Sequence, residues 1–472
     1  MKHLSSYLLI LILLCAMVGG AQAVTWTDAG GCWTATDGAD SLVMWNVTAT
    51  TTWTPPAGVT SVEYLVVAGG GSGGSSGANA GGRGGGGGGG VLNASGFAVS
   101  GTLNVVVGAG GAATSAGNYV GNNGQNSAFS SIVSTGGGGG GANFDQPGNN
   151  GGSGGGEGHY SGNFGAGAAG PPRQGYDGGS GYGAASYGGG GGGGAGVAGG
   201  DASSSVSGTG GNGISNSITG TVIIYAGGGA GGVYRTDGTL GSPGAGGGGA
   251  GGTPSSDGNN GNPGTNNLGG GGGGASAGIS TARCGGAGGS GIVIIRYLTP
   301  VAPIASFTTN TTSGVAPLAI LLTDTSTNTP TSWAWGAKNS TPGNETWFGI
   351  GTTTPLTTIL GVGNWSMRVN ATNVAGTNTS TQVTWVNVST GVIKPIAISS
   401  FSRYTIPVGS YMWYNDTSLN VPTAWCWTFG DGTFAAVANG RKTYYQRTIQ
   451  NVSSCPSNSA GGNCSYNIIR VI

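Results

Sequence analysis

The chain has 472 residues, of which 110 are glycine and only 6% are charged, and its formal net charge is zero. Ordinary soluble domains carry roughly 25% charged residues and about 7% glycine. The balance of charge excludes the basic surface of a nucleic-acid-binding protein and indicates an exterior made by Ser, Thr, Asn and backbone amides.

The first 23 residues have the pattern of a secretory signal peptide. Lys2 precedes an apolar run from Tyr7 to Val18, and small residues follow as far as Ala23. The run has about a dozen residues, whereas a membrane-spanning helix needs about 20, so a retained membrane helix is the weaker alternative. We therefore expect residues 1–23 to be removed and the mature chain to be extracellular, secreted or on a cell or virion surface, without stable membrane insertion.

Residues 24–298 are predicted to form a glycine-rich β-domain. Short segments rich in β-branched or aromatic residues interrupt its glycine runs, as strands would. These segments are 61–67, 103–107, 221–225 and 291–297. Glycine loses more backbone entropy on ordering than other residues, so the runs need an interaction other than side-chain burial. Helices of the polyproline II type, packed side by side through N–H and C=O groups, would provide it.

Four motifs of this domain occur in an order that resembles the glycine-rich domain of phage tail and receptor-binding proteins. They are WTPPAGVTSVEYLVVAGGG from Trp53, LNVVVGAGG from Leu103, TGTVIIYAGGG from Thr219 and GGSGIVIIRY from Gly288. The resemblance implies a β-sandwich from which polyglycine II helices project, with an adhesive surface at the ends of the helices in some phage adhesins. It carries over no individual binding residue.

After a linker at 298–303 the composition shifts to Thr, Ser, Asn, Val and Trp, which marks a domain boundary. Residues 303–335 and 363–377 resemble the opening and closing strands of a PKD domain, and we assign 299–391 to it. A divergent second copy is expected at 392–472. The chain is therefore predicted to be all-β: a glycine-rich β-sandwich with inserted polyglycine II helices, followed by two immunoglobulin-like PKD β-sandwiches.

The second copy retains the family's Trp-x-Trp-x-Phe-Gly-Asp-Gly signature in PTAWCWTFGDGT, from Pro422 to Thr433. Side chains two apart on a strand point to one face, so its tryptophans should fill the core before a tight turn. The first copy keeps both tryptophans but has Gly-Ala-Lys where the turn is expected. The signature residues in the two copies are Trp333, Trp335, Trp425, Trp427, Phe429, Gly430, Asp431 and Gly432.

The sequence offers little for catalysis. His159 is the only histidine after residue 23 and is interpreted as a solvated loop residue, and no Cys, His or carboxylate spacing fits zinc. Asp324 and Asp431 could contribute oxygens to a calcium ion, but strand-end and turn hydrogen bonds are the preferred interpretation. We predict no catalytic residue and no cofactor, with calcium as a weak alternative.

Five cysteines remain after residue 23, an odd number in an oxidising compartment. We expect a disulfide between Cys32 and Cys284, near the first and last strands of the glycine-rich domain. A second is expected between Cys455 and Cys464, which leaves Cys426 as the odd thiol.

Asn-X-Ser/Thr triplets are dense in the C-terminal half, and glycosylation there would give a sugar-coated, protease-resistant stalk. The candidate acceptors are Asn310, Asn364, Asn370, Asn378 and Asn415.

These features favour a non-enzymatic adhesin or display protein. The glycine-rich domain would present a surface to extracellular glycans or cell-surface proteins, and the PKD modules would serve as spacer or anchor. The alternative is a structural component of a surface layer, fibre or coat that associates only with its own copies. A secreted hydrolase would need a catalytic domain that the sequence does not show.

Overall fold

The computed structural model describes the chain in ten ranges. They are 24–78, 81–142, 146–159, 163–183, 188–204, 206–234, 238–278, 280–340, 346–391 and 394–472. Every regular element in these ranges is a β-strand, so the predicted all-β class is confirmed. The chain divides into two compact units, Met1–Pro300 and Val301–Ile472. The expected signal peptide lies outside the described residues.

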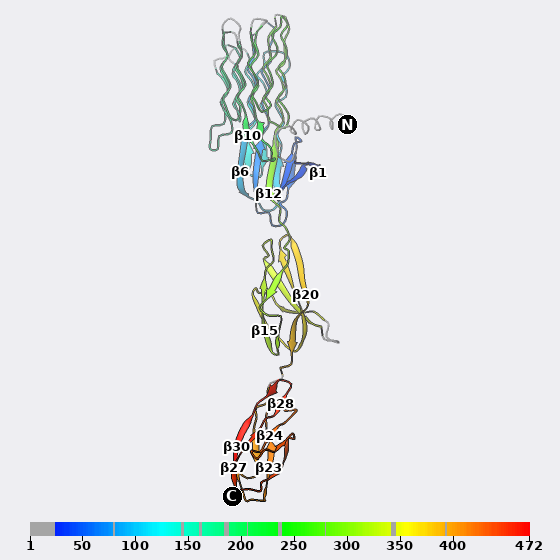
Figure 1. Ribbon diagram of the computed structural model, residues 1–472. Coiled ribbons are helices and arrows are strands. Elements are labelled where there is room, and N and C mark those ends of the chain that lie inside the picture. The colour runs from blue at the N-terminus through cyan, green and yellow to red at the C-terminus, as the bar shows by residue number, and fades with distance from the viewer. Residues whose placement is uncertain are drawn as a thin grey trace. The chain divides into compact units, whose positions relative to one another are not determined.

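The first unit contains a sandwich of two antiparallel sheets (Figure 1). The larger has the order β1-β2-β3-β12-β5-β6, with strands β1 (Thr27–Asp28), β2 (Trp33–Asp37), β3 (Asp40–Trp45), β12 (Ile292–Leu298), β5 (Ser61–Val67) and β6 (Val91–Ala98). The smaller has the order β4-β7-β8-β9, with strands β4 (Thr50–Trp53), β7 (Leu103–Val106), β8 (Ser127–Phe129) and β9 (Ile132–Ser134). Trp45, Tyr64 and Ile295 of the larger sheet and Val105 and Phe129 of the smaller share one core.

Strands β5 and β12 are buried on both faces. A second apolar cluster covers their other face and includes Leu65, Val67, Ile292 and Ile294. It is completed by Tyr225, from a two-stranded sheet of β10 (Ile214–Asn216) and β11 (Ile223–Tyr225). Burial on both faces explains why these central strands have continuous rather than alternating apolar sequences. The four segments predicted from sequence correspond to β5, β7, β11 and β12.

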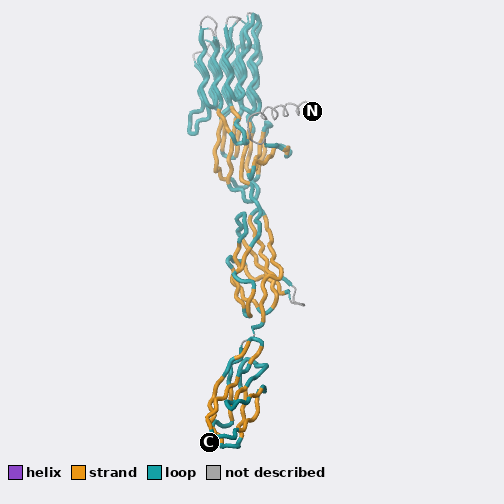
Figure 2. The backbone as a smooth tube through the Cα atoms, in the orientation of Figure 1, coloured by secondary structure: helices purple, strands orange, loops and turns teal. Residues whose placement is uncertain are grey.

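The glycine runs continue from the strand ends as extended segments that lie side by side (Figure 2). This glycine array comprises the described residues within 68–90, 107–126, 135–213 and 226–291. Hydrogen bonds join segments that are distant in sequence: the N–H of Gly71 donates to the carbonyl of Gly87 at 2.8 Å, and the N–H of Gly87 donates to the carbonyl of Gly138 at 2.8 Å. Each segment therefore satisfies its backbone through its neighbours.

The spacing inside the array leaves no room for side chains. A Cβ atom placed on Gly86 would lie closer than 3.0 Å to the carbonyl oxygen of Gly71, and one on Gly229 would lie equally close to that of Gly272. Real Cβ atoms essentially never approach a backbone atom this closely. Glycine is required here because the backbones pack against each other directly.

The second unit begins with a sandwich at residues 301–391, here called the first module. Its three-stranded sheet has the order β13-β15-β18, with strands β13 (Phe307–Thr309), β15 (Leu318–Asp324) and β18 (Leu356–Leu360). Its five-stranded sheet has the order β14-β20-β19-β16-β17, with strands β14 (Ser313–Val315), β20 (Gly376–Ser389), β19 (Gly363–Asn373), β16 (Ser332–Asn339) and β17 (Phe348–Gly351). Phe307, Trp335 and Met367 lie in the shared core.

The second module, residues 394–472, repeats this arrangement strand for strand. Its three-stranded sheet has the order β21-β23-β26, with strands β21 (Ser399–Phe401), β23 (Tyr411–Asp416) and β26 (Asn439–Thr443). Its five-stranded sheet has the order β22-β30-β27-β24-β25, with strands β22 (Thr405–Ile406), β30 (Ser465–Val471), β27 (Thr448–Ser454), β24 (Trp427–Thr428) and β25 (Phe434–Ala435). A short pair, β28 (Ser457–Asn458) and β29 (Gly461–Gly462), follows β27.

Equivalent contacts show that the modules are two copies of one immunoglobulin-like fold. The Nε1–H of Trp335 in β16 donates to the carbonyl of Thr353 at 2.8 Å, and that of Trp427 in β24 donates to the carbonyl of Val437 at 2.9 Å. In both modules one edge strand of the five-stranded sheet pairs in parallel with the last strand of that sheet. These pairs are β14 with β20 and β22 with β30. The two copies therefore share topology, register and the buried tryptophan.

One of the two expected disulfides is present. Cys455 and Cys464 are bonded, whereas Cys32 and Cys284 are both free thiols, so the expected Cys32–Cys284 pairing is wrong. Cys32 packs against the sandwich core, but Cys284 lies eight residues before β12, within the glycine array. At about 3 Å per extended residue, this places Cys284 some 25 Å along the array. Proximity in sequence to the last strand was a poor guide because the chain between them is extended.

Candidate functional site at the far end of the glycine array

Among the described residues of the glycine array, a cluster of polar side chains around Arg83 is buried at a distance from the sandwich. Arg83 has 0% of its surface exposed and His159 has 5%. Arg83 precedes β6 by eight residues, which at about 3 Å per residue puts it near the end of the array remote from the strands. An arginine is almost never fully buried unless it is paired, so its contacts decide what the cluster does.

The guanidinium of Arg83 contacts three other segments. Its Nε–H donates to the carbonyl of Ser75 at 3.0 Å, and its Nη2 donates to Oδ1 of Asn118 at 2.7 Å. Its Nη1 lies 3.3 Å from Nδ1 of His159. Oδ1 of Asn118 also accepts from the N–H of Gly77 at 2.9 Å, which fixes the amide that the arginine contacts.

The backbone of Arg83 extends the same cross-link. Its N–H donates to the carbonyl of Ala275 at 3.2 Å, and its carbonyl accepts from the N–H of Gly232 at 2.8 Å. One residue thus joins segments that are more than 190 positions apart in sequence. Arg83 therefore cross-links several segments near the end of the array that is remote from the strands.

Burial sets the charge state of the cluster. It lowers the pKa of Arg83 to about 9. Burial, followed by the charge of Arg83, lowers the pKa of His159 to about 4. His159 is therefore neutral at pH 7, and its Nδ1 accepts from the guanidinium.

The structure corrects the interpretation of His159 as a solvated loop residue. It is buried beside Arg83, and Gly81, in a left-handed conformation with φ of +74°, leaves the space that the imidazole ring occupies. Glu157 is also buried, at 7% exposure, and its Oε2 accepts from the N–H of Gly181 at 2.9 Å. Sequence reasoning missed Arg83, although a charged residue inside a glycine run was a usable signal.

The composition of the cluster does not fit a metal centre. Within the described ranges, no group of three His, Cys, Asp or Glu side chains could hold a metal ion. Arg83, His159 and Asn118, here called the tip cluster, combine one guanidinium, one neutral imidazole and one amide with backbone carbonyls. These groups cross-link neighbouring segments of the array.

The signature tryptophans lie in the module cores. Trp335 and Trp427 are buried, at 2% and 0% exposure, while Trp333 and Trp425 are half-buried against the same cores. The Nε1–H of Trp425 donates to Oδ2 of Asp416 at 2.8 Å.

The Gly-Asp-Gly turn follows β24. The N–H of Phe429 donates to the carbonyl of Thr433 at 3.1 Å, and Gly430 and Gly432 have φ of +76° and +85°. These angles are in the left-handed region that glycine favours.

The two aspartates considered for calcium have protein partners. Oδ1 of Asp324 accepts from the hydroxyl of Ser326 at 2.6 Å. Asp431 accepts from Thr433 at 2.6 Å and pairs with Lys442 at 2.7 Å. These contacts are the turn and strand-end hydrogen bonds preferred from sequence, and the weak calcium alternative gains no support from them.

The candidate glycosylation sites lie on the module surfaces. Asn310, Asn364, Asn378 and Asn415 are exposed, and Asn370 is half-buried. Oδ1 of Asn370 accepts from the hydroxyl of Thr379 at 2.9 Å.

In the described part of the chain no helix is long and apolar enough to cross a membrane.

Comparisons with known proteins show one family and several solved structures of low similarity. No curated protein matches the sequence. Among solved structures, the amphioxus IgVJ-C2 molecule matches at 15% identity over 34% of this chain and 99% of its own, with a TM-score of 0.23.

Two further structures are similar at the same low level. Titin domains Z1Z2 in complex with telethonin match at 17% identity over 37% of this chain and 98% of that chain, with a TM-score of 0.24. The three N-terminal domains of the bacteriophage RB49 outer capsid protein Hoc match at 13% identity over 36% and 59%, with a TM-score of 0.15. By contrast, the model of the glycine-rich domain family matches residues 46–298, more than half of the sequence. The chain therefore belongs to the glycine-rich domain family.

Proposed function

We propose that this chain is an extracellular display protein or adhesin whose glycine array is a rigid bundle of polyglycine II helices. The observation that carries the proposal is the network of hydrogen bonds between glycine segments, in which Gly86 donates to Gly272 at 2.8 Å and accepts from Gly229 at 2.9 Å. Each such bond contributes about 0.5 to 1.5 kcal/mol net, so an extensive network resists bending. A rigid array can hold binding groups at its far end in fixed positions.

The tip cluster supports the same assignment. Arg83 and His159 are buried where the array is most distant from the sandwich, and their contacts hold several segments together. We infer that this end of the array recognises extracellular glycans or cell-surface proteins. The two modules, which we assign to the PKD family, act as spacer or anchor, and the chain has a binding rather than a catalytic role.

Amide hydrogen exchange on the purified chain tests the proposal. The N–H groups of residues 84–90 and 188–194 should exchange slowly, at rates comparable to those of β5 and β12. Screening on a glycan array and on cell surfaces would then identify the ligand. Fast exchange throughout these runs would mean a flexible brush and would leave only a spacer or coat.

A structural fibre or coat component is the second candidate, and one observation favours it. Apolar side chains are exposed on the outer face of the five-stranded sheet in the second module, with exposures of 77% for Phe434, 77% for Tyr466 and 63% for Ile468. Exposed apolar patches commonly mark interaction sites. Sedimentation velocity over a range of concentrations decides between the candidates: association abolished by Tyr466→Ser favours the coat, and a concentration-independent monomer opposes it.

A further inference from the structure

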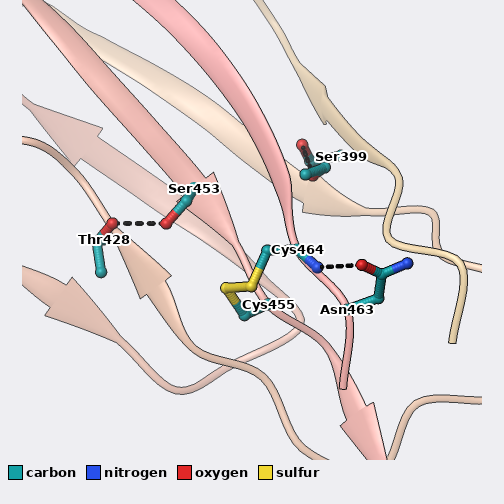
Figure 3. The surroundings of a disulfide bond; sticks show 7 residues. Ser399, Thr428, Ser453, Cys455, Asn463 and Cys464 are labelled. Carbon is teal, nitrogen blue, oxygen red and sulfur yellow. Dashed lines mark hydrogen bonds between the residues drawn. A yellow bond between two sulfur atoms is a disulfide. The ribbon is translucent and has the colours of Figure 1, made fainter. Parts of the chain in front are cut away.

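Three cysteines of the second module lie in one row at the ends of three neighbouring strands, each one residue outside its strand. Cys426 and Cys455 exchange both backbone hydrogen bonds, N–H of Cys455 to carbonyl of Cys426 at 2.9 Å and N–H of Cys426 to carbonyl of Cys455 at 3.3 Å. Cys455 is in turn bonded to Cys464, which lies next to the first residue of β30 (Figure 3). Cys455 is thus the middle member of the row.

The three side chains share the outer face of the sheet. Two residues along from Cys426 and Cys455, the hydroxyls of Thr428 and Ser453 are 2.7 Å apart on that face (Figure 3). Side chains two residues apart on a strand point the same way, so Cys426 and Cys455 face each other in the same manner. Cys426 is exposed, whereas Trp427 beside it points into the core.

The first module provides an internal control on this register. There the equivalent row is Ala334, Asn370 and Thr379, with Ala334 opposite Asn370 and Asn370 opposite Thr379. The side chains of Asn370 and Thr379 touch through a hydrogen bond of 2.9 Å. The same row in the second module therefore places three sulfur-bearing side chains next to one another.

We propose that this row is an intramolecular thiol–disulfide exchange site in which Cys455 changes partner between Cys464 and Cys426. Residues that exchange both hydrogen bonds in an antiparallel pair have Cα atoms about 5.5 Å apart, within the range of roughly 4.4–6.8 Å that a disulfide spans. A Cys426–Cys455 bridge therefore fits the existing backbone. Thiol–disulfide exchange proceeds by attack of a thiolate on a disulfide sulfur.

The exchange needs no external oxidant. The Cys426 thiolate attacks Sγ of Cys455, a Cys426–Cys455 bond forms, and the Cys455–Cys464 bond breaks. Cys464 leaves as a thiolate and takes up a proton, so one disulfide and one thiol are present before and after. The bridge moves from the β27–β30 side to the β24–β27 side, and the loop that contains β28 and β29 loses its covalent closure.

The variant Cys464→Ser tests whether the second bridge can form. In a glutathione redox buffer, followed by acid quenching and non-reducing peptide mapping, it should give an intramolecular Cys426–Cys455 disulfide with the module folded. The matched control Cys426→Ser should keep the Cys455–Cys464 bond. A folded Cys464→Ser protein in which Cys455 is found only as its glutathione mixed disulfide, with Cys426 free, would contradict the proposal.

The unmodified chain provides a test that does not depend on the variant folding. After incubation at pH 8.5 and acid quenching, N-ethylmaleimide should label Cys464 increasingly and Cys426 correspondingly less, whereas incubation at pH 5 should leave the label on Cys426, because the thiolate is the nucleophile. Cys32 and Cys284, which have no neighbouring disulfide, should stay equally labelled at both pH values. Identical maps at pH 5 and pH 8.5 would overturn the exchange site.

Discussion

In the two modules tryptophan side chains fill the interior, whereas in the glycine array backbone amides and carbonyls occupy it. Trp335 and Trp427 are almost completely buried, while the array is so tightly spaced that a Cβ atom on Gly86 has no room. The modules gain stability from apolar burial, which tolerates changes of shape that conserve volume. The array gains it from hydrogen bonds whose geometry fixes the spacing.

The difference also explains why the array is attached to a sandwich. Ordering a residue costs about 1 to 2 kcal/mol, and a hydrogen bond returns about 0.5 to 1.5 kcal/mol, so glycine segments alone roughly break even. The two apolar clusters on either face of β5 and β12 supply the additional stability. The array is therefore expected to depend on the sandwich, whereas the modules carry their own cores.

The largest expected effect comes from removing a module's central tryptophan. Trp427→Ala should lower the free energy of unfolding of the second module by about 3–5 kcal/mol, since it empties a fully buried site and leaves the carbonyl of Val437 without its donor. Chemical denaturation followed by tryptophan fluorescence measures the change. The control Trp413→Ala, at a position 53% exposed, should cost less than about 1 kcal/mol. Exchange rates in the glycine array should not change, and a change there would break the comparison.

A single methyl group should damage the array almost as much. Gly86→Ala forces Cβ against the carbonyl of Gly71 and should destabilise the array by about 3 kcal/mol, because rigid backbone rather than a flexible side chain must move. The control is Gly170→Ala, where a Cβ meets nothing within 4 Å. Amide exchange of the neighbouring glycines reports the effect. Equal tolerance of both substitutions would show that the segments are not in direct contact.

Acid should loosen the array through its one buried imidazole. The pKa of His159 falls from 6.5 in the unfolded chain to about 4 in the folded one, so the unfolded chain binds the proton first. The stabilisation from neutral His159 is complete above pH 6.5 and declines between pH 6.5 and 4. The total loss below pH 4 is at most about 3.5 kcal/mol. Amide exchange of the residues around His159, measured from pH 7 to 4, should show this dependence of stability on pH. His159→Gln should flatten it, and an unchanged slope in the variant would place the titration elsewhere.

The smallest effect is expected at the turn of the second module. Burial acts to raise the pKa of Asp431, but hydrogen bonds from Lys442 and Thr433 and the charge of Lys442 outweigh it and lower the pKa. The contribution of this carboxylate is present above its unfolded pKa of 3.8 and is lost as the pH falls through the lower folded value. Asp431→Asn should cost about 0.5–1 kcal/mol at pH 7, measured by thermal unfolding. Asp416→Asn gives a comparison within the same module, because it replaces with an NH2 donor one of the two carboxylate oxygens that accept from Trp425 and Ser418.

Local composition was sufficient to predict several features. The segment 61–67 is the strand β5 with both its bounds, and the segment 291–297 overlaps β12, since both are short runs of residues with high β-propensity bounded by glycine or turn residues. The Trp-x-Trp pattern predicted the core positions of Trp335 and Trp427 because alternation on a strand is a local property. The Cys455–Cys464 loop is short enough for spacing in sequence to suggest the bond.

Long-range neighbours, by contrast, were decided only by the tertiary structure. The sequence placed His159 in a glycine-rich stretch, but only the packing of the array brings it to Arg83, which also contacts Asn118, and removes it from water. The same packing holds Cys284 away from Cys32, and the register of β24 on β27 sets Cys426 beside Cys455. By itself the sequence determined four strand segments of the first unit, the core positions of Trp335 and Trp427, and where side chains are absent. The glycine runs are nearly identical to one another, so no local signal specifies which run bonds to which, and the connections between strands make that choice.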